Sequence, residues 1–365
     1  MAEAISSNQE SSHRPTKSCV IIYNPLAGKL RRRGSDRLER AARILTEAGY
    51  ETTLVPTSGP GAAVALARGW VADGVGLIVA AGGDGTINEV AEGMVHSAVP
   101  LGILPAGTAN VLAMETGMSS NLETAARDLL TYTPERISVG RLDFNNGSPA
   151  RRHFLLMAGV GLDARVIYNL SAPLKTNLGK IAYWIAAFGL MGRRLEEFSV
   201  KIDDRDYRCS FALVSKVRNY GGDLQIARDT SLFDDQFEVV LFRGQSSMRY
   251  LRYFVGLVRN RLQGMEGVCI LRAHKLHVSP VRDARVYMQV DGEYAGHLPG
   301  SVEIVRDAIT LLLPPLYKRR VELTGSRLNT RSIHGSNSAF FSAAPFCVIP
   351  SGDTKKGRGG TTNRG

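Results

Sequence analysis

Residues 76–89 read GLIVAAGGDGTINE, and the interpretation of the whole chain starts from this stretch. Its first part, residues 76–80, is a short apolar run of the kind that forms a buried parallel strand. Thr86 and Glu89 have the spacing of a capping box, which predicts that a helix begins at Thr86. The sequence therefore predicts a strand, a glycine loop and a helix in that order.

The glycine loop in this stretch is suited to binding a phosphate. Glycine has no Cβ, so an anion can approach the main-chain N–H groups, and the free N-terminus of a helix attracts the same charge. Asp84 is the exception, because a carboxylate repels a phosphate unless a cation lies between them. Asp84 thus indicates Mg²⁺ bridging to a nucleotide. The alternative is an ordinary glycine-rich turn with an Asp-Gly corner, and the loop alone leaves both open.

The same order of strand, loop and helix occurs four times within residues 18–117. Apolar strands at 19–23, 52–55, 76–80 and 100–104 are each followed by a loop and a helical pattern. Such alternation predicts βαβ units and a parallel sheet. All four loops then lie at the carboxyl ends of the strands, where open α/β sheets bind ligands. Two of them place a Gly-Thr step at a helix start, Gly85-Thr86 and Gly107-Thr108.

The pattern changes near residue 136, after which strands follow one another with few helices between them. This succession predicts an antiparallel second domain. The expected strands cover residues 136–139, 153–160, 198–202, 207–217, 237–242, 269–278, 285–290, 302–305 and 309–313.

Two helical stretches interrupt these strands. Residues 178–191 are apolar nearly all round, so this helix is expected to be buried or to cover an apolar cavity. In residues 249–262, one apolar stripe is formed by Leu251, Phe254, Val255, Val258 and Leu262, with Arg249, Arg252 and Arg259 on another face. We interpret the second stretch as an ordinary amphipathic surface helix in preference to a membrane-surface helix.

A chain of 365 residues is long enough for about two domains. We predict a disordered segment at 1–16, an α/β nucleotide-binding domain at 17–135, a β-rich second domain at 136–317 whose last strands can return to the first domain, and a disordered basic tail at 318–365. The tail carries nine Lys or Arg and two acidic residues, which is +7 of the formal net charge of +11. Because most of the excess charge lies outside the predicted domains, we expect no nucleic-acid partner.

The four cysteines lie far apart and form no CxxC pair, which is typical of reduced thiols in a cytosolic protein. The N-terminus has no apolar secretory signal. The longest apolar run, residues 181–191, is shorter than the about 20 residues that span a bilayer. We expect a cytoplasmic protein with peripheral membrane contact, and a homodimer is among the assemblies that the sequence allows.

Two common nucleotide-binding motifs are absent. Gly28-Lys29 is followed by Leu30 rather than Ser or Thr, so there is no GxxxxGK[ST] phosphate loop, and no GxGxxG occurs. Four other stretches, in this order and spacing, resemble the diacylglycerol kinase catalytic family, which also contains sphingosine and ceramide kinases and bacterial lipid kinases. They are residues 24–29 (NPLAGK), 82–86 (GGDGT), 102–110 (GILPAGTAN) and 290–293 (VDGE), with weaker landmarks at 159–164 and 219–222. The resemblance spans roughly residues 17–317, although GGDG alone is shared with NAD kinases.

This resemblance implies two domains with ATP in the cleft between them, the first related to the NAD-kinase fold and the second a β-sandwich. It implies that Asp291 is the general base and that Glu293 supports it or helps to hold Mg²⁺, with Asp84 beside them. It also implies a structural Mg²⁺ held by the Asp235 side chain and the main-chain carbonyls of Leu232 and Phe237. The implied nucleotide contacts are Asn24, Thr57, Gly82, Gly83, Asp84, Gly85, Thr86, Ile87, Asn88 and Thr108.

The chain departs from the family pattern at two positions. Val111 follows Asn110 where the family often has Asp, which puts one polar contact in doubt. Gln236 follows Asp235 where the family usually has Gly, which puts the structural metal in doubt because a glycine-dependent turn is lost.

Phosphoryl transfer needs positioned phosphates, a metal and a group that accepts the alcohol proton. Val286, Met288 and Val290 alternate toward the core, so Asp291 falls just beyond a strand end, where it can face a cleft. The pattern alone favours an ordinary Asp-Gly hairpin turn at this place. The family resemblance favours the general base.

We therefore expect an ATP- and Mg²⁺-dependent lipid kinase that phosphorylates a hydroxyl of diacylglycerol or a related long-chain alcohol at a membrane surface. An NAD kinase would use the same GGDG loop, but the apolar helix and the Asp-Gly-Glu corner of the second half suit a lipid alcohol. A third alternative is a non-catalytic regulator that binds nucleotide or lipid. The presence of both Asp84 and Asp291 argues against it.

Overall fold

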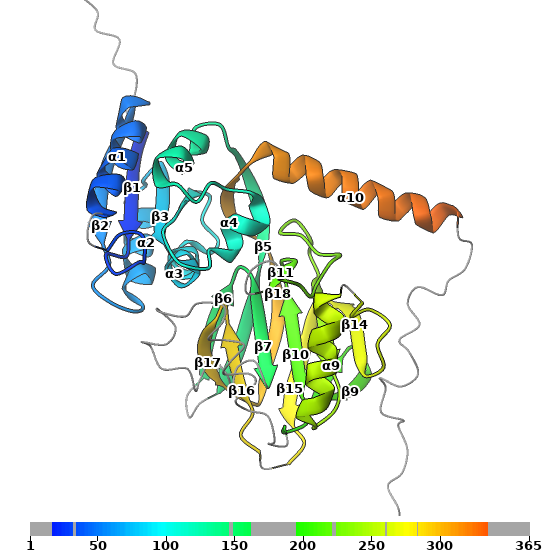
Figure 1. The fold of residues 1–365 in the computed structure, drawn as a ribbon. Helices are drawn as coiled ribbons and strands as arrows, with labels where there is room; N and C mark the ends of the chain where they lie inside the picture. Colours follow the sequence, from blue (N-terminus) through cyan, green and yellow to red (C-terminus); the bar gives the residue numbers. More distant parts are fainter. Residues whose placement is uncertain are drawn as a thin grey trace, which may run out of the picture.

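The structure of the chain is a computed structural model that describes residues 17–31, 34–145, 149–161, 195–220, 224–259, 261–282 and 284–334. It has an α/β part built on a parallel sheet, followed by a larger β part, which is the predicted fold class (Figure 1). The expectations for residues 1–16, 178–191 and 335–365 lie outside the described residues.

The α/β part is a parallel sheet between two layers of helices. Its strand order is β2-β1-β3-β4, and the middle strands are apolar on both faces because helices cover both. Helices α1 and α5 cover one face, and α2 and α3 cover the other. The strands are β1 (Lys17–Tyr23), β2 (Tyr50–Pro56), β3 (Leu77–Gly82) and β4 (Pro100–Pro105). The helices are α1 (Gly34–Glu47), α2 (Ala62–Ala72), α3 (Asp84–Met94), α4 (Val111–Thr116) and α5 (Leu122–Leu129).

Two long antiparallel strands, β5 (Thr133–Asn145) and β18 (Gly300–Leu313), connect the two parts. The start of β18 also pairs with β15 (Lys275–Pro280), whereas its end runs parallel to β4. The register of β18 shifts between Val305 and Ile309, between the segments that pair with β15 and with β4. One ten-stranded sheet therefore passes through both parts of the molecule.

A second, six-stranded antiparallel sheet packs on the first to form a sandwich. Its order is β14-β13-β10-β7-β16-β17, and alternate side chains of both sheets fill the core between them. Helix α9 (Ser247–Val258) covers the outer face of this sheet through Tyr253 and Leu257. The remaining strands are β6 (Pro149–Phe154), β7 (Met157–Gly161), β8 (Phe198–Ile202), β9 (Arg205–Cys209), β10 (Phe211–Ser215), β11 (Asn219–Tyr220), β12 (Leu224–Gln225), β13 (Phe237–Phe242), β14 (Val268–Ala273), β16 (Tyr287–Val290) and β17 (Glu293–His297).

The predicted capping box is wrong. Helix α3 begins at Asp84, two residues before Thr86, and Gly83 is its N-cap. The Glu89 carboxylate instead accepts hydrogen bonds from the main-chain N–H groups of Gly61 (2.8 Å) and Ala63 (3.3 Å). Gly61 has no side chain to cap α2, so the neighbouring helix supplies the acceptor.

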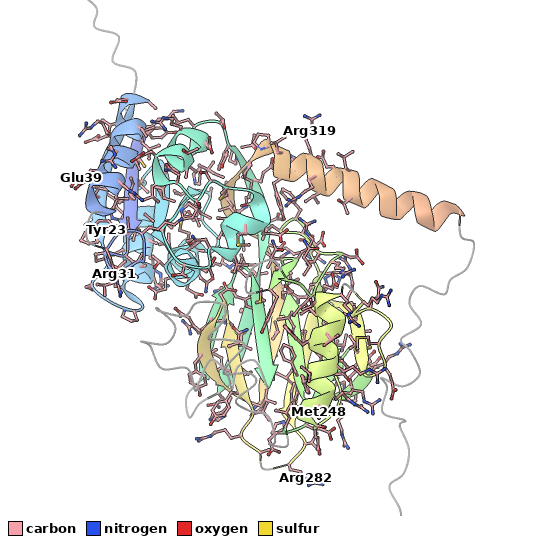
Figure 2. The ribbon with its side chains drawn as sticks, in the orientation of Figure 1. Tyr23, Arg31, Glu39, Met248, Arg282 and Arg319 are labelled. Atoms are coloured by element: carbon pink, nitrogen blue, oxygen red, sulfur yellow. The ribbon has the colours of Figure 1, made fainter. Side chains whose placement is uncertain are left out.

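The chain is helical where the sequence predicted the start of a disordered tail. Helix α10 covers Pro315–His334, so the boundary at residue 318 is corrected. The helix is attached by its first turns: the Tyr317 hydroxyl accepts the Leu232 N–H at 3.0 Å, Lys318 pairs with Glu135 at 2.8 Å, and Arg320 donates to a main-chain oxygen of Glu115. Arg319 on the same turn points outward (Figure 2). Composition could not show these contacts, because every partner is distant in sequence.

Among the helices of the described part, none has both the length and the apolar composition needed to cross a bilayer.

We predict that Tyr317→Phe lowers the free energy of unfolding. The Tyr317 residue is only 1% exposed. Removing its hydroxyl leaves the buried Leu232 N–H without an acceptor, which costs about 1–3 kcal/mol. The control is Leu316→Ala, at a side chain 75% exposed, for which about 0.5 kcal/mol or less is expected. Urea unfolding measures both, and equal stabilities for the two variants would show that α10 is not anchored through Tyr317.

Candidate active site

The four loops that follow the parallel strands lie together at one edge of the sheet. Main-chain bonds join them in sequence: Thr57 N–H to Tyr23 (2.8 Å), Asn24 N–H to Ala81 (3.1 Å), and Ala106 N–H to Gly82 (2.8 Å). The Asn24 amide also reaches the Thr86 hydroxyl at 3.5 Å. The structure thus brings the loops that carry the predicted nucleotide contacts to one place.

The glycines of these loops allow two main chains to approach closely. A Cβ on Gly107 would collide with Cα of Gly83, and a Cβ on Gly82 would lie 2.5 Å from that of Thr86. Gly83, the N-cap of α3, has no side chain that could bond the N–H groups of the first turn, although the Asp84 carboxyl bonds the N–H of its own residue. These N–H groups and the dipole of the helix fit a phosphate.

Asp84 lies at the N-terminus of the neighbouring helix α4. Its Oδ1 accepts the Leu112 N–H at 3.2 Å, so its side chain connects the GGDG loop to the loop of residues 105–110. Burial raises the pKa of this carboxyl, and main-chain hydrogen bonds around residues 110–112 oppose the rise.

Asn110 gives the second loop its shape, a role that the sequence did not reveal. Its φ of 50° is left-handed, and its side chain both accepts the Gly107 N–H and donates to the Gly107 carbonyl, each at 2.9 Å. Val111, at the position where the family often has Asp, packs into the hydrophobic core. The polar contact placed in doubt by this residue is therefore replaced by packing.

Two of the implied nucleotide contacts have other partners. The Ile87 side chain is in the hydrophobic core, and the Asn88 amide donates to the main-chain carbonyl of His153 at 3.0 Å. The Ile87 side chain is therefore packed in the core, and the amide nitrogen of Asn88 already has a partner. Asn88 instead connects α3 to the second domain.

Asp291 forms an Asp-Gly hairpin turn, and its half-buried carboxylate is an acceptor site at the same time. Asp291 and Gly292 have φ values of 47° and 83°, as a two-residue turn between β16 and β17 requires. The Asp291 carboxylate accepts N–H groups from Leu155 (2.9 Å), Leu156 (3.0 Å) and Met157 (2.9 Å). The sequence left two alternatives for Asp291, a hairpin turn or a general base. The structure shows that the turn geometry does not exclude the second role.

The environment of Asp291 holds its pKa near neutrality. Burial raises the pKa of Asp291, the three N–H groups oppose this rise, and the nearby charge of Asp84 adds to it. The net result is a pKa of about 7. A carboxyl with such a pKa is charged at slightly alkaline pH and can then accept a proton.

Glu293 faces the GGDG loop. Its carboxylate lies 2.5 Å from where a Cβ on Gly85 would be, and it pairs with the Arg152 guanidinium at 3.2 Å. Asp84, Asp291 and Glu293 therefore surround a loop that is shaped for an anion, and a phosphate there requires an accompanying cation. No group of three acidic, His or Cys side chains in the described ranges is arranged to hold a metal by itself. Carboxylate oxygens are the kind of ligand that a divalent cation accompanying a phosphate would take.

Residues 152–157 connect all these groups and were not identified from the sequence. Arg152 pairs with Glu293, and His153 bonds to Glu92 of α3 through its main-chain N–H (2.6 Å) and through Nδ1 (3.0 Å). The next N–H groups hold Asp291. The letters RHFLLM match no motif, because the function of this segment depends on its partners in space.

The residues implied for a structural metal do not fit one. Asp235 accepts the Ser138 hydroxyl at 2.5 Å and lies 3.8 Å from Arg306, while Asp234 pairs with Arg272 at 3.0 Å. The fully buried Lys216 ammonium donates to the main-chain carbonyl of Asp234. Burial lowers the pKa of Lys216, and the charges of Asp234 and Asp235 oppose this change. The net result is a pKa of about 8. Three cationic side chains already face this loop and would repel a metal ion.

These contacts argue against a metal held by the Asp235 side chain and the main-chain carbonyls of Leu232 and Phe237. Gln236, at the position where the family usually has Gly, was a sign in the sequence that the metal site is altered. The sequence did not show that Lys216 supplies positive charge, because this buried lysine lies outside the loop.

Comparison with known proteins places the chain in a family. The model of the diacylglycerol kinase catalytic domain matches residues 18–142, and that of the YegS C-terminal NAD kinase beta sandwich-like domain matches residues 157–313. The diacylglycerol kinase of Bacillus subtilis is 28% identical over 304 residues, which is 82% of this chain and 97% of that protein. That of Staphylococcus saprophyticus is 26% identical over 306 residues, 82% of this chain and 96% of its own.

The fold agrees with these matches. The crystal structure of a diacylglycerol kinase from Bacillus anthracis has a TM-score of 0.67 at 22% identity and covers 82% of this chain and 98% of its own. The chain belongs to the diacylglycerol kinase catalytic family, as its motifs predicted.

We predict that Lys216→Met destabilises the protein and that wild-type stability does not depend on Mg²⁺. Removal of the ammonium leaves a buried carbonyl and nearby carboxylates without their cation, which costs about 1–3 kcal/mol. The control Lys275→Met removes a half-exposed partner of Glu303 and should change stability by about 1 kcal/mol or less. Thermal unfolding in EDTA and in Mg²⁺, without nucleotide, measures both effects. Stabilisation of the wild type by Mg²⁺ that is lost in Asp235→Asn would restore the metal site.

Proposed function

We propose that the protein is an ATP- and Mg²⁺-dependent kinase that transfers the terminal phosphoryl group to a hydroxyl of diacylglycerol or a related long-chain lipid alcohol. The observation that carries this proposal is the Asp291 carboxyl, which has a pKa of about 7 and lies near Asp84 of the GGDG loop. A non-catalytic binding protein has no need for a carboxyl poised in this way.

The residues of the chain divide the reaction between them. The glycine loop and the first turn of α3 bind the phosphates, and Mg²⁺ neutralises their charge when it is bound. Asp291 accepts the proton of the lipid hydroxyl as the new O–P bond forms and the bond to the leaving ADP breaks. Glu293, held by Arg152, fixes the edge of the loop beside Gly85, and the bonds of His153 to α3 fix the distance between base and phosphates.

The choice of a lipid acceptor is supported by the relatives, whose names describe diacylglycerol kinases. A lipid hydroxyl is a weak nucleophile, and a half-buried base next to an apolar second domain suits such an acceptor. Since diacylglycerol stays in the bilayer, we propose that the enzyme acts at a membrane surface.

Phosphate transfer to a panel of acceptors tests the proposed function. Purified protein, ATP and Mg²⁺ are incubated with diacylglycerol, monoacylglycerol, sphingosine, ceramide or NAD, and the products are measured by mass spectrometry. We expect phosphorylated diacylglycerol or a closely related lipid phosphate. Phosphorylation of NAD alone would assign the other enzyme class, and the absence of any product would leave a binding protein.

We predict that Asp291→Asn lowers kcat by about 10²–10⁴-fold while the affinity for ATP changes little, because the change keeps the size and removes the basicity. In the wild type, kcat/KM should rise as the pH increases through about 7, since the raised pKa means that the carboxyl becomes charged only in this range. This rise should be absent in the variant. Steady-state kinetics from pH 5.5 to 9 measure both effects.

Two further variants make the assignment specific. Glu293→Gln should cost less than Asp291→Asn, since Glu293 supports the loop and does not take the proton. Asp84→Asn should lose activity with the fold intact. If Asp291→Asn keeps a near-normal kcat while Asp84→Asn is inactive, the base is Asp84 and the proposed role of Asp291 is wrong.

A further inference from the structure

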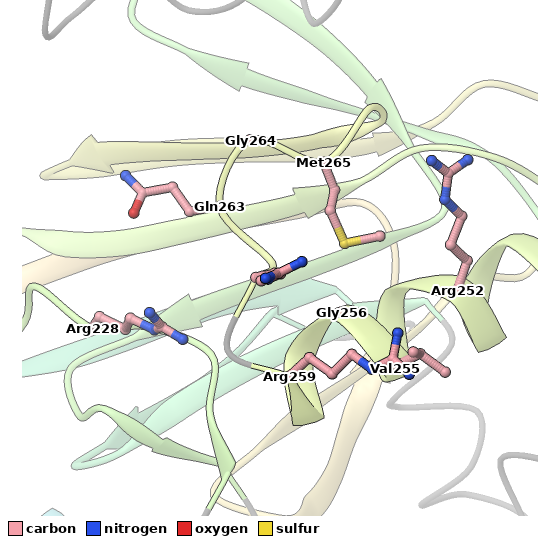
Figure 3. A pocket seen from close by; sticks show the side chains of 9 residues that line it. Arg228, Arg252, Val255, Gly256, Arg259, Gln263, Gly264 and Met265 are labelled. Atoms are coloured by element: carbon pink, nitrogen blue, oxygen red, sulfur yellow. The ribbon is translucent and has the colours of Figure 1, made fainter.

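Helix α9 and the loop after it surround a hollow with four arginines. The hollow measures ≈ 790 Å³, and Arg228, Arg252, Arg259 and Arg261 line it together with Val255 and Met265 (Figure 3). No acidic side chain is among the lining residues. We call these four side chains and the space between them the arginine hollow.

The fold brings these like charges together through a glycine. A Cβ on Gly256 would collide with the Met265 side chain, so the glycine allows the loop to pack back on the helix. The N–H of Arg261 donates to the Gly256 carbonyl at 2.7 Å, and Leu262 is buried beneath the loop. Arg261 is thereby held across from the arginines of α9 instead of moving away from them.

The charges of three of these arginines are not compensated within the part of the chain that the structure describes. Arg252, Arg259 and Arg261 take part in none of its ion pairs, whereas Arg218 and Arg272 pair with carboxylates at 3.0 Å. Guanidinium groups bind phosphate oxygens well because their planar donors match them. The arginine hollow therefore fits a phosphate-bearing ligand.

The same face of α9 exposes aliphatic side chains. Met248, Val255 and Val258 are 68%, 40% and 58% exposed, and their spacing places them in one stripe with Arg252 and Arg259. Of the predicted apolar stripe, Leu262 is buried but Val255 and Val258 are exposed, and Tyr253 and Leu257 face the sheet instead. Met248 lies at the outer surface of the β part (Figure 2).

The combination of exposed aliphatic and cationic side chains distinguishes a bilayer from a soluble anion. A free phosphate would use the arginines alone and gain nothing from Met248 and Val258. An anionic bilayer uses both, since headgroup phosphates meet the guanidinium groups while apolar side chains enter the boundary of the acyl chains.

We propose that this face of α9, with the arginine hollow, docks on an anionic phospholipid bilayer. Its relevance to catalysis rests on the proposed function, because a kinase that acts on diacylglycerol must meet its substrate in the membrane. The docking itself requires neither ATP nor a lipid alcohol, so it is measured independently of catalysis.

Vesicle sedimentation without ATP and without diacylglycerol tests the proposal. The full chain is expected to bind phosphatidylglycerol vesicles and not phosphatidylcholine vesicles. Reversal of three charges, Arg252→Glu with Arg259→Glu and Arg261→Glu, should weaken binding by roughly 100-fold or more, because each basic residue near such a surface contributes about fivefold. The matched control reverses Arg43, Arg68 and Arg127, three exposed arginines of α1, α2 and α5 that take part in none of the described ion pairs. It should lose about threefold or less.

The apolar contribution has its own variant, Met248→Ser with Val258→Ser. At high salt, where charge attraction is screened, it should bind anionic vesicles several-fold more weakly than the wild type. Equal binding of this variant and the wild type would overturn the bilayer assignment.

Three other outcomes overturn the proposal. These are equal losses in the two charge-reversal variants, failure of the wild type to bind anionic vesicles, and stabilisation by inorganic pyrophosphate that requires the arginine hollow and occurs without vesicle binding. The last outcome would assign the hollow to a soluble anion. Turnover of a short-chain diacylglycerol in detergent by the variant with Arg252→Glu, Arg259→Glu and Arg261→Glu tests the kinase activity separately. We expect this turnover to equal that of the wild type.

Discussion

The capture of the Asp291 carboxylate by the N–H groups of Leu155, Leu156 and Met157 is the interaction on which the site depends. It ties the β16–β17 hairpin to the turn before β7, and the residues just before that turn hold Glu293 and helix α3. The proposed base Asp291, the carboxylate of Glu293 and the glycine loop are thereby fixed relative to one another by one short segment. Three hydrogen bonds compensate for the burial of this charge only in part, which leaves its pKa at about 7. The contacts that position the carboxyl therefore also set its basicity.

Most of the fold and the location of the site follow from local patterns in the sequence. The four apolar strands and their glycine loops are short-range signals, and parallel topology then places the loops at one edge of the sheet. The features that the sequence did not reveal depend on partners far away in the chain. Glu89 caps a neighbouring helix, Asn88 bonds to the second domain, and Tyr317 anchors α10. Each of these residue types could also have interacted with neighbours close in sequence. Their actual partners are determined by how two elements far apart in the chain pack together.

Buried and exposed cations have different uses in this molecule. The loop of residues 231–237 has carboxylates that a metal ion could have compensated, but Lys216, Arg272 and Arg306 supply the positive charge from within the chain. Such internal compensation makes the loop independent of metal concentration. The arginines of α9 lack compensation of this kind and lie beside exposed aliphatic side chains. Charges brought together without partners inside the described fold indicate a partner outside it.

The pKa of Asp291 is the quantity that tests this account most directly. Carbon-13 NMR of protein labelled at aspartate carboxyls, with Asp291→Asn used to assign the resonance, would measure it without substrate. The account predicts a midpoint of about 7, because burial and the charge of Asp84 outweigh three hydrogen bonds. A midpoint near the ordinary aspartate value of about 4 would contradict the account, since such a carboxylate would be too weak a base for the role assigned to it.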